Sequence, residues 1–400
     1  MHIAWLGKKS PFCGNVTYGL TTTAALRQRG HEISFFHFDA PAAQTGRTPR
    51  PQDSGEDPDP CCPQDGDHPP DVALPYLVKS QIYTIPSPRA ARDLRDALER
   101  LKPDVVHASL TLSPLDFRLP DICQQLGLPL VATFHPPFDA KLRNATAAGQ
   151  QLSYQLYAPF LARYNRVVVF SALQAQQLTR LGVPQDRIAV IPNGVDSSIW
   201  CPGPSPLLHR FDGRRVFLYM GRLSTEKNVE ALLRAWRAVR PQGCVLVVVG
   251  DGPLRANLQT LASEPDVIWW GYEQRMDNRI ALLRAAEVFI LPSLVEGQSL
   301  ALLEAMAVGV ACLATDAGAD GEVLSDGAGI VLSTDGVAFQ LRTLLPLLRD
   351  QPRFTADLGR QARQRVLDRY TLDVSISALE QLYGVLPAEA RTPPLARQGS

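Results

Sequence analysis

Two glutamates mark a segment in the second half of the chain whose residue types suit a phosphorylated ligand. Glu296 follows an apolar, strand-like run that ends at Leu291, and Gly297 comes directly after it. A helix is predicted to begin near Ser299, and the first N–H groups of a helix lack partners within it, so they form an anion site. Because glycine has no side chain, the backbone at Gly297 can approach a ligand closely. We therefore expect phosphate to bind at this strand–helix junction.

Glu304 is the only charged residue in that helix, which otherwise consists of small and apolar residues. An unpaired carboxylate buried there would cost several kilocalories per mole, so something must satisfy it. Hydroxyl groups of a ligand are the favoured partners. The alternative is a structural carboxylate paired with backbone groups or with an arginine.

Two cations follow another strand-like run, Val216–Met220. Arg222 can clamp a phosphate through two parallel hydrogen bonds, and Lys227 adds a point charge. Their position after the first strand of the second half favours a role in anion binding over an ordinary place on the surface.

The glycine-containing loops do not match the pattern of a nicotinamide-binding site. In the loop that begins at Gly250, the third glycine position is Arg255, and the first loop of the chain fails the same test. Gly14 could still approach a phosphate through its backbone, or could simply be a turn residue. His135 follows the strand-like run Leu130–Phe134, where it would hydrogen-bond a sugar hydroxyl or a departing phosphate, unless its role is structural.

Apolar runs alternate with helical patterns along the whole chain, which predicts an α/β fold with parallel sheets covered on both faces. Two such series predict two doubly wound, Rossmann-like domains that face each other across a cleft, with ligands at the carboxyl ends of the strands. The expected divisions are residues 1–196 with a disordered insertion at 41–70, a Pro/Ser-rich linker at 197–206, a second domain at 207–365, closing helices at 366–386 and a disordered tail at 387–400.

The composition narrows the class of partner. The net charge of the 400 residues is zero, which argues against nucleic-acid binding. Outside the acidic stretch 41–71, the first 195 residues carry 17 Lys/Arg and 10 Asp/Glu, which would favour an anionic surface if it is not ordinary solvated charge. Two Asp-x-Asp triplets, Asp57-Pro58-Asp59 and Asp65-Gly66-Asp67, lie in the low-complexity insertion, so we expect no metal and no cofactor.

The location is expected to be cytoplasmic. The seven cysteines form no C-x-x-C pair, and the N-terminus lacks the order of a signal peptide. No apolar run is long enough to span a membrane, although attachment to the cytoplasmic face of one stays open.

Taken together, these segments resemble the retaining glycosyltransferases of family four, which have the GT-B fold. The resemblance covers most of the chain, and it is carried by Gly221–Lys227, by the Ile191–Asp196 run before the linker, by the two glutamates seven residues apart, and by Thr315-Asp316. The family commonly has Phe-Gly after Glu-Gly, where this chain has Gln298-Ser299, so the sugar contacts and the donor stay open.

The resemblance implies a nucleotide sugar, favoured as a UDP-sugar, as the donor. It implies that Arg222 and Lys227 neutralise the diphosphate and that Glu304 holds the ribose. Glu296 and the backbone of Gly297, Gln298 and Ser299 would hold the sugar. The remaining donor contacts would come from Gly221, Leu300, Tyr272, Gly14 and His135.

The first half also resembles cyanobacterial members of the family, among them a galactosyltransferase that makes digalactosyl lipid. A glycolipid acceptor and contact with an anionic membrane would fit the basic N-terminal half and the stretch from Tyr154 to Arg166, although aromatic residues at helical spacing also fit core packing. A nucleotide-sugar epimerase and a non-catalytic binding protein stay open as alternatives to a glycosyltransferase that uses an acceptor sugar or glycolipid.

Overall fold

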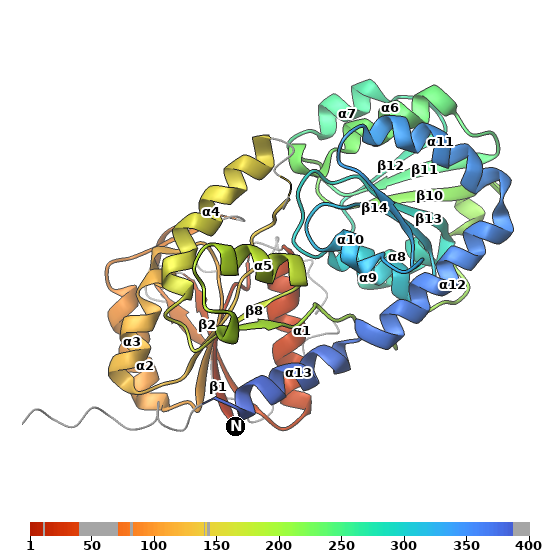
Figure 1. Cartoon of the computed structure of the whole chain (residues 1–400). Coiled ribbons are helices and arrows are strands. Elements are labelled where there is room, and N and C mark those ends of the chain that lie inside the picture. The colour runs from red at the N-terminus through yellow and green to blue at the C-terminus, as the bar shows by residue number, and fades with distance from the viewer. Residues whose placement is uncertain (11–12, 40–70, 81–82, 140, 142–144, 387–400) are drawn as a thin grey trace, which may run out of the picture.

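The computed structural model describes residues 1–10, 13–39, 71–80, 83–139, 141 and 145–386. The predicted insertion at 41–70, with both Asp-x-Asp triplets, and the tail at 387–400 lie outside these residues. The described chain forms two lobes, each with a parallel sheet between helices (Figure 1).

The first lobe contains a seven-stranded parallel sheet in the order β3-β2-β1-β6-β7-β8-β9. Its strands are β1 (His2–Leu6), β2 (Glu32–Phe38), β3 (Val72–Leu74), β6 (Val105–Ser109), β7 (Leu130–Thr133), β8 (Arg166–Val169) and β9 (Ile188–Val190), and a separate antiparallel pair consists of β4 (Tyr76–Lys79) and β5 (Thr84–Pro86). Its helices are α1 (Gly14–Gln28), α2 (Ala90–Leu101), α3 (Leu119–Leu126), α4 (Ala145–Leu161) and α5 (Ala172–Arg180).

The second lobe contains a six-stranded parallel sheet in the order β12-β11-β10-β13-β14-β15. Its strands are β10 (Arg215–Met220), β11 (Cys244–Val249), β12 (Val267–Gly271), β13 (Ala286–Leu291), β14 (Ala311–Thr315) and β15 (Ile330–Leu332). Its helices are α6 (Val229–Val239), α7 (Arg255–Leu261), α8 (Met276–Ala285), α9 (Leu300–Val308), α10 (Asp320–Val323), α11 (Val337–Asp350) and α12 (Pro352–Arg369), and the last helix of the chain is α13 (Leu372–Gly384).

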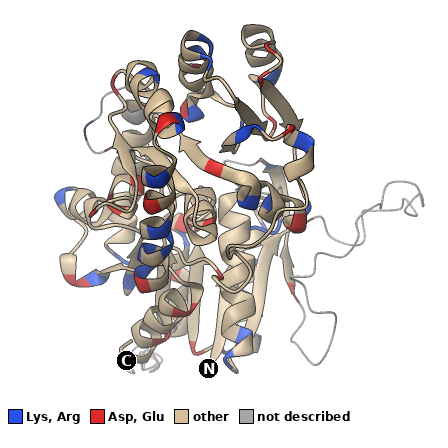
Figure 2. Cartoon of the chain, turned by 90° about the vertical axis from the view of Figure 1, so that its right-hand side faces the viewer, with Lys and Arg blue, Asp and Glu red and all other residues tan. Residues whose placement is uncertain are grey.

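The predicted α/β class with two doubly wound sheets is confirmed, because the central strands are buried on both faces. All six residues of β11 are buried, as are all five of β6 and of β14. Lys, Arg, Asp and Glu lie mostly on helices and loops (Figure 2). The sequence-based prediction missed the short strands β3, β4, β5 and β15 and the short helices α3, α7 and α10, which span between three and eight residues.

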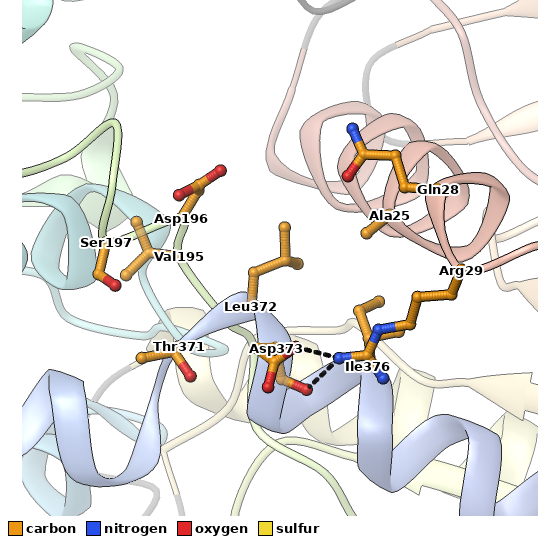
Figure 3. A pocket seen from close by; sticks show the side chains of 10 residues that line it. All are labelled: Ala25, Gln28, Arg29, Val195, Asp196, Ser197, Thr371, Leu372, Asp373 and Ile376. Carbon is orange, nitrogen blue, oxygen red and sulfur yellow. Dashed lines mark hydrogen bonds and ion pairs between the residues drawn. The ribbon is translucent and has the colours of Figure 1, made fainter.

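The chain crosses between the lobes twice at one place. Val195 N–H donates to the carbonyl of Tyr370, and Leu372 N–H donates to the carbonyl of Val195, so the outgoing linker and the junction of α12 with α13 pair there. A cavity of about 220 Å³ lies beside this crossover, and Arg29, the residue that follows α1, reaches Asp373 across it (Figure 3). Residues of α13 then pack into the core of the first lobe. The chain therefore connects the two lobes through two segments, the linker and the junction of α12 with α13.

The aromatic stretch that the sequence offered as membrane-binding is core. Tyr154, Tyr157 and Tyr164 are at most 3% exposed, and the hydroxyl of Tyr157 donates to the buried carboxylate of Asp116. Arg163 from the same stretch pairs with Asp121. The membrane interpretation of this stretch is therefore wrong. Among the described residues, none of the helices has both the length and the apolar character that crossing a bilayer requires.

Helix α13 is also tied to the first lobe through a buried histidine on β6. His107 Nδ1 lies 2.6 Å from the hydroxyl of Tyr383, and His107 Nε2 lies 2.7 Å from Thr133 Oγ1. Its ring stacks on Trp5 at 4.2 Å between centroids. Burial lowers the pKa of His107 to about 3, well below the ordinary value of 6.5.

This depressed pKa predicts a pH-dependent contribution to stability. The unfolded chain binds a proton at His107 below about pH 6.5, whereas the folded chain does so only near pH 3, so the free energy of unfolding falls as pH drops through this window. His107→Asn should make that fall shallower than in the wild type, as measured by urea unfolding at pH 7, 6, 5 and 4. Carboxylates titrate equally in both proteins, so a difference between the two slopes of unfolding free energy against pH reports His107. Equal slopes would contradict the prediction.

Candidate active site

A cavity of about 1020 Å³ lies between the lobes, at the carboxyl ends of both sheets. Parallel sheets present ligands at this edge. All twelve residues that the sequence singled out line it: Gly14, His135, Gly221, Arg222, Lys227, Tyr272, Glu296, Gly297, Gln298, Ser299, Leu300 and Glu304. A single ligand could therefore contact all of these residues.

Lys227 and Glu296 form an ion pair in the wall of this cavity. Lys227 Nζ lies 2.5 Å from Glu296 Oε2, and Ser293 Oγ donates to the same oxygen over 3.1 Å. The side chains are 21% and 12% exposed, so water screens the pair only in part. The strand–helix junctions after β10 and β13 thus place a cation and an acid against each other.

Arg222 is held much less tightly. Its guanidinium lies 3.9 Å from Glu226, and its side chain is 37% exposed towards the cavity. Its loop rests on the loop after β11, because a Cβ at Gly250 would lie only 1.9 Å from the carbonyl oxygen of Gly221. Gly250 also has a φ of +135°, which favours glycine. The loop after β11, which begins at Gly250, therefore supports the loop that carries Arg222.

The start of α9 differs in one detail from the expectation. Ser299 is the N-cap, and its Oγ accepts from the N–H of Leu302. The Ser299 N–H itself donates to Asp320 Oδ1 over 2.9 Å, so it is already bonded within the protein. Burial and the neighbouring Glu296 carboxylate raise the pKa of Asp320. The first-turn N–H groups at the cavity are those of Leu300 and Ala301.

Glu304 has a protein partner, which corrects the expectation that ligand hydroxyls alone satisfy it. Arg279 Nη2 lies 2.6 Å from Glu304 Oε2, and the Glu304 side chain is 6% exposed. Burial raises the pKa of Glu304, and the charge and hydrogen bond of Arg279 oppose that rise. Both residues line the cavity, so the pair still offers carboxylate oxygen to a ligand.

The first lobe contributes a neutral imidazole whose protonated nitrogen can be assigned. Asn15 Nδ2 donates to the carbonyl of Leu110, and Ser109 Oγ donates to Asn15 Oδ1. Since the Ser109 proton is committed, His135 Nε2 must donate to Ser109 Oγ, 2.8 Å away. Burial lowers the pKa of His135 to about 3, so the ring is neutral with Nδ1 as its acceptor. A Cβ at Gly14 would meet nothing within 4 Å, so that glycine has open space beside the cavity.

Several contacts close the lobes on each other around the cavity. Phe138 N–H donates to the carbonyl of Glu296 over 3.0 Å. The side-chain oxygen of Gln298 accepts from the N–H of Asn193 over 2.6 Å, so the residue that departs from the family pattern joins the two lobes. Glu322 accepts from the first N–H groups of α5.

Tyr272 lies at the rim, with 52% of its surface exposed. The sequence reasoning did not single out Arg279 or Tyr18, which also line the cavity, and it included Asn193 only as part of the Ile191–Asp196 run. A buried glutamate signals that some cation is needed, but nothing in the sequence says which of 40 Lys and Arg residues supplies it.

Comparison with known proteins assigns the family. Residues 14–199 match the model described as glycosyltransferase family 4, and residues 214–350 match the model described as glycosyl transferases group 1. Glycogen synthase of Mycobacterium tuberculosis is 30% identical over 298 residues, which span 70% of this chain and 69% of that protein. The chain belongs to glycosyltransferase family 4.

Other relatives agree with this assignment. The MMP α-(1→4)-mannosyltransferase of Mycolicibacterium hassiacum is 28% identical, over 93% of this chain and 95% of that protein. With a mannosyltransferase and a glycogen synthase among its relatives, the chain is a hexosyltransferase.

Solved structures share the fold. Sucrose-phosphate synthase from Thermosynechococcus elongatus has a TM-score of 0.75 at 19% identity, and covers 96% of this chain and 98% of its own. Anabaena HepE in complex with UDP and glucose has a TM-score of 0.73 at 16% identity, over 96% and 100%. The predicted GT-B arrangement of two Rossmann-like domains is confirmed.

Proposed function

We propose that this family-4 enzyme transfers a hexose from a UDP-sugar to an acceptor hydroxyl with retention of the anomeric configuration. The observation that carries the proposal is the convergence on one cavity of Arg222, Lys227 and the first turn of α9. These groups suit the two negative charges of a leaving diphosphate. HepE, which shares the fold, binds UDP and glucose, which supports uracil as the base.

The leaving group is proposed to depart without a metal. Arg222 would give up only its 3.9 Å contact with Glu226, and Lys227 can turn from Glu296 towards phosphate while Glu296 accepts from sugar hydroxyls. The first-turn N–H groups of α9 are fixed by the helix, and groups held in place before reaction stabilise a transition state because they need little reorganisation. Glu304 would accept from the ribose hydroxyls, and His135 Nδ1 from a hydroxyl of the sugar.

Retention is proposed to follow from attack on the same face of the sugar. A double-displacement route would need a carboxylate on the opposite side to act as nucleophile. The described cavity-lining residues of the first lobe include Asn15, Thr17, Tyr18 and His135, but no carboxylate. These neutral polar groups suit an acceptor that presents hydroxyls. With the membrane interpretation of Tyr154–Arg166 withdrawn, a glycolipid acceptor rests on the basic N-terminal half and on the cyanobacterial resemblance.

The test is product analysis across UDP-, ADP- and GDP-linked hexoses, each with soluble sugar acceptors, with glycolipid vesicles and with no acceptor. We expect transfer from a UDP-hexose, and we expect NMR of the product to show the donor's anomeric configuration. An inverted product would contradict the retaining mechanism. A converted donor sugar in the incubation without acceptor would instead indicate an epimerase.

A further inference from the structure

Arg279 lines the cavity and links helices α8 and α9 to the linker between the lobes. It projects from α8 towards Glu304 on the neighbouring helix α9. Its guanidinium also lies 5.1 Å from the ring centroid of Trp200, which belongs to the linker between the lobes. Trp200 is 6% exposed, so the arginine lies between a buried aromatic ring and a buried carboxylate.

We infer that Arg279 is a positioning residue that keeps the Glu304 carboxylate oriented for the ribose hydroxyls and thereby sets the affinity for the nucleoside part of the donor. This inference rests on the proposed function. A carboxylate that rotates freely would accept a diol poorly, whereas one held by a planar guanidinium presents its other oxygen in a fixed direction. Trp200 holds the guanidinium in turn through a cation–π contact.

Among the described charged residues near Glu304, Arg279 is the one that pairs with its carboxylate. Helix α9 has no other charged residue. Lys227 is paired with Glu296. Glu273 accepts from Trp270 and Asn278. From α12, Arg363 donates to the carbonyl of Ala307 and not to Glu304.

The experiment compares UDP, its 2′,3′-dideoxy analogue and inorganic pyrophosphate. All three carry two linked phosphates, but only UDP has the ribose diol. Binding is measured by calorimetry on the full chain. Arg279→Leu should weaken UDP binding by about 10- to 100-fold, the size of one lost charge-assisted hydrogen bond. Affinity for pyrophosphate and for the dideoxy analogue should stay at the wild-type level, because neither has the ribose diol.

The matched control is Arg275→Leu, which makes the same change on an exposed residue just before α8 that does not line the cavity. It should leave all three affinities unchanged. Arg279→Lys retains the charge without the planar fork, so it should restore part of the UDP affinity. Thermal unfolding of each variant shows whether it is folded, so a loss of pyrophosphate binding is read only in variants that keep the cooperative unfolding transition of the wild type.

Measuring UDP affinity over a range of pH distinguishes an Arg279 that positions the Glu304 carboxylate from one that only packs against its neighbours. Without Arg279, only the effect of burial on Glu304 remains, so its pKa rises further and the carboxylate becomes protonated at higher pH than in the wild type. UDP affinity of Arg279→Leu should therefore recover as pH rises from 6 to 9, while wild-type affinity changes less.

The outcomes separate the two proposals. Wild-type UDP affinity in Arg279→Leu, or an equal loss for pyrophosphate, would overturn the inference alone. A wild-type protein that binds neither UDP nor pyrophosphate would overturn the proposed function together with it.

Discussion

Arg222→Ala is expected to lower kcat for hexose transfer by about 100- to 1000-fold, the effect of removing one preorganised group that stabilises a developing charge. The side chain is 37% exposed and its nearest acid, Glu226, is 3.9 Å away, so little in the folded protein depends on it. We therefore expect the melting temperature to stay within about 2 °C of the wild type, as is usual for surface substitutions. Steady-state kinetics and thermal unfolding on the same preparation measure both quantities.

The matched control is Arg234→Ala on α6. Arg234 is 65% exposed and pairs with Glu230, so it loses a comparable surface ion pair outside the cavity. Its kcat should equal that of the wild type. If Arg222→Ala also kept full turnover, the diphosphate would have to bind elsewhere in the cavity. A large loss in both variants would indicate a general effect of charge.

The parallel-sheet core was predictable because its signal is local. Runs such as Val245–Val249 are apolar throughout, and only a strand covered on both faces tolerates this pattern. The same rule explains why the candidate site could be assembled in advance: Arg222, Glu296 and His135 each follow such a run, and the carboxyl ends of parallel strands share an edge.

What the sequence could not predict depends on contacts between distant segments. Arg279 and Glu304 lie on separate helices, and only the packing of α8 beside α9 brings them within 2.6 Å. Asp320 accepts a hydrogen bond from the N–H of Ser299 because the loop after β14 folds back over the loop after β13. The aromatic residues of α4 have the same spacing whether they face core or membrane, so their spacing could not decide between the two.

Lys227→Ala is expected to weaken UDP binding by about 100-fold, because it removes a cation and also exposes a carboxylate to the diphosphate. In the wild type, Lys227 Nζ lies 2.5 Å from Glu296 Oε2 and offsets its charge. Without Lys227, Glu296 remains beside Asp320, whose pKa is raised first by burial and then by the charge of Glu296. The variant therefore presents net negative charge where the wild type presents a neutral pair.

The double variant Lys227→Ala/Glu296→Gln separates these two causes. It lacks the cation but also the repulsive charge, so we expect it to bind UDP about tenfold more tightly than Lys227→Ala, through relief of one like-charge contact. UDP is the informative ligand because it has no hexose, and the loss of Glu296 as a sugar contact does not enter the measurement. If the double variant bound UDP more weakly than Lys227→Ala, Glu296 would be a direct ligand of the nucleotide. Kinetics with the complete donor should show the opposite order, since removal of Glu296 then costs the contact that holds the sugar for transfer.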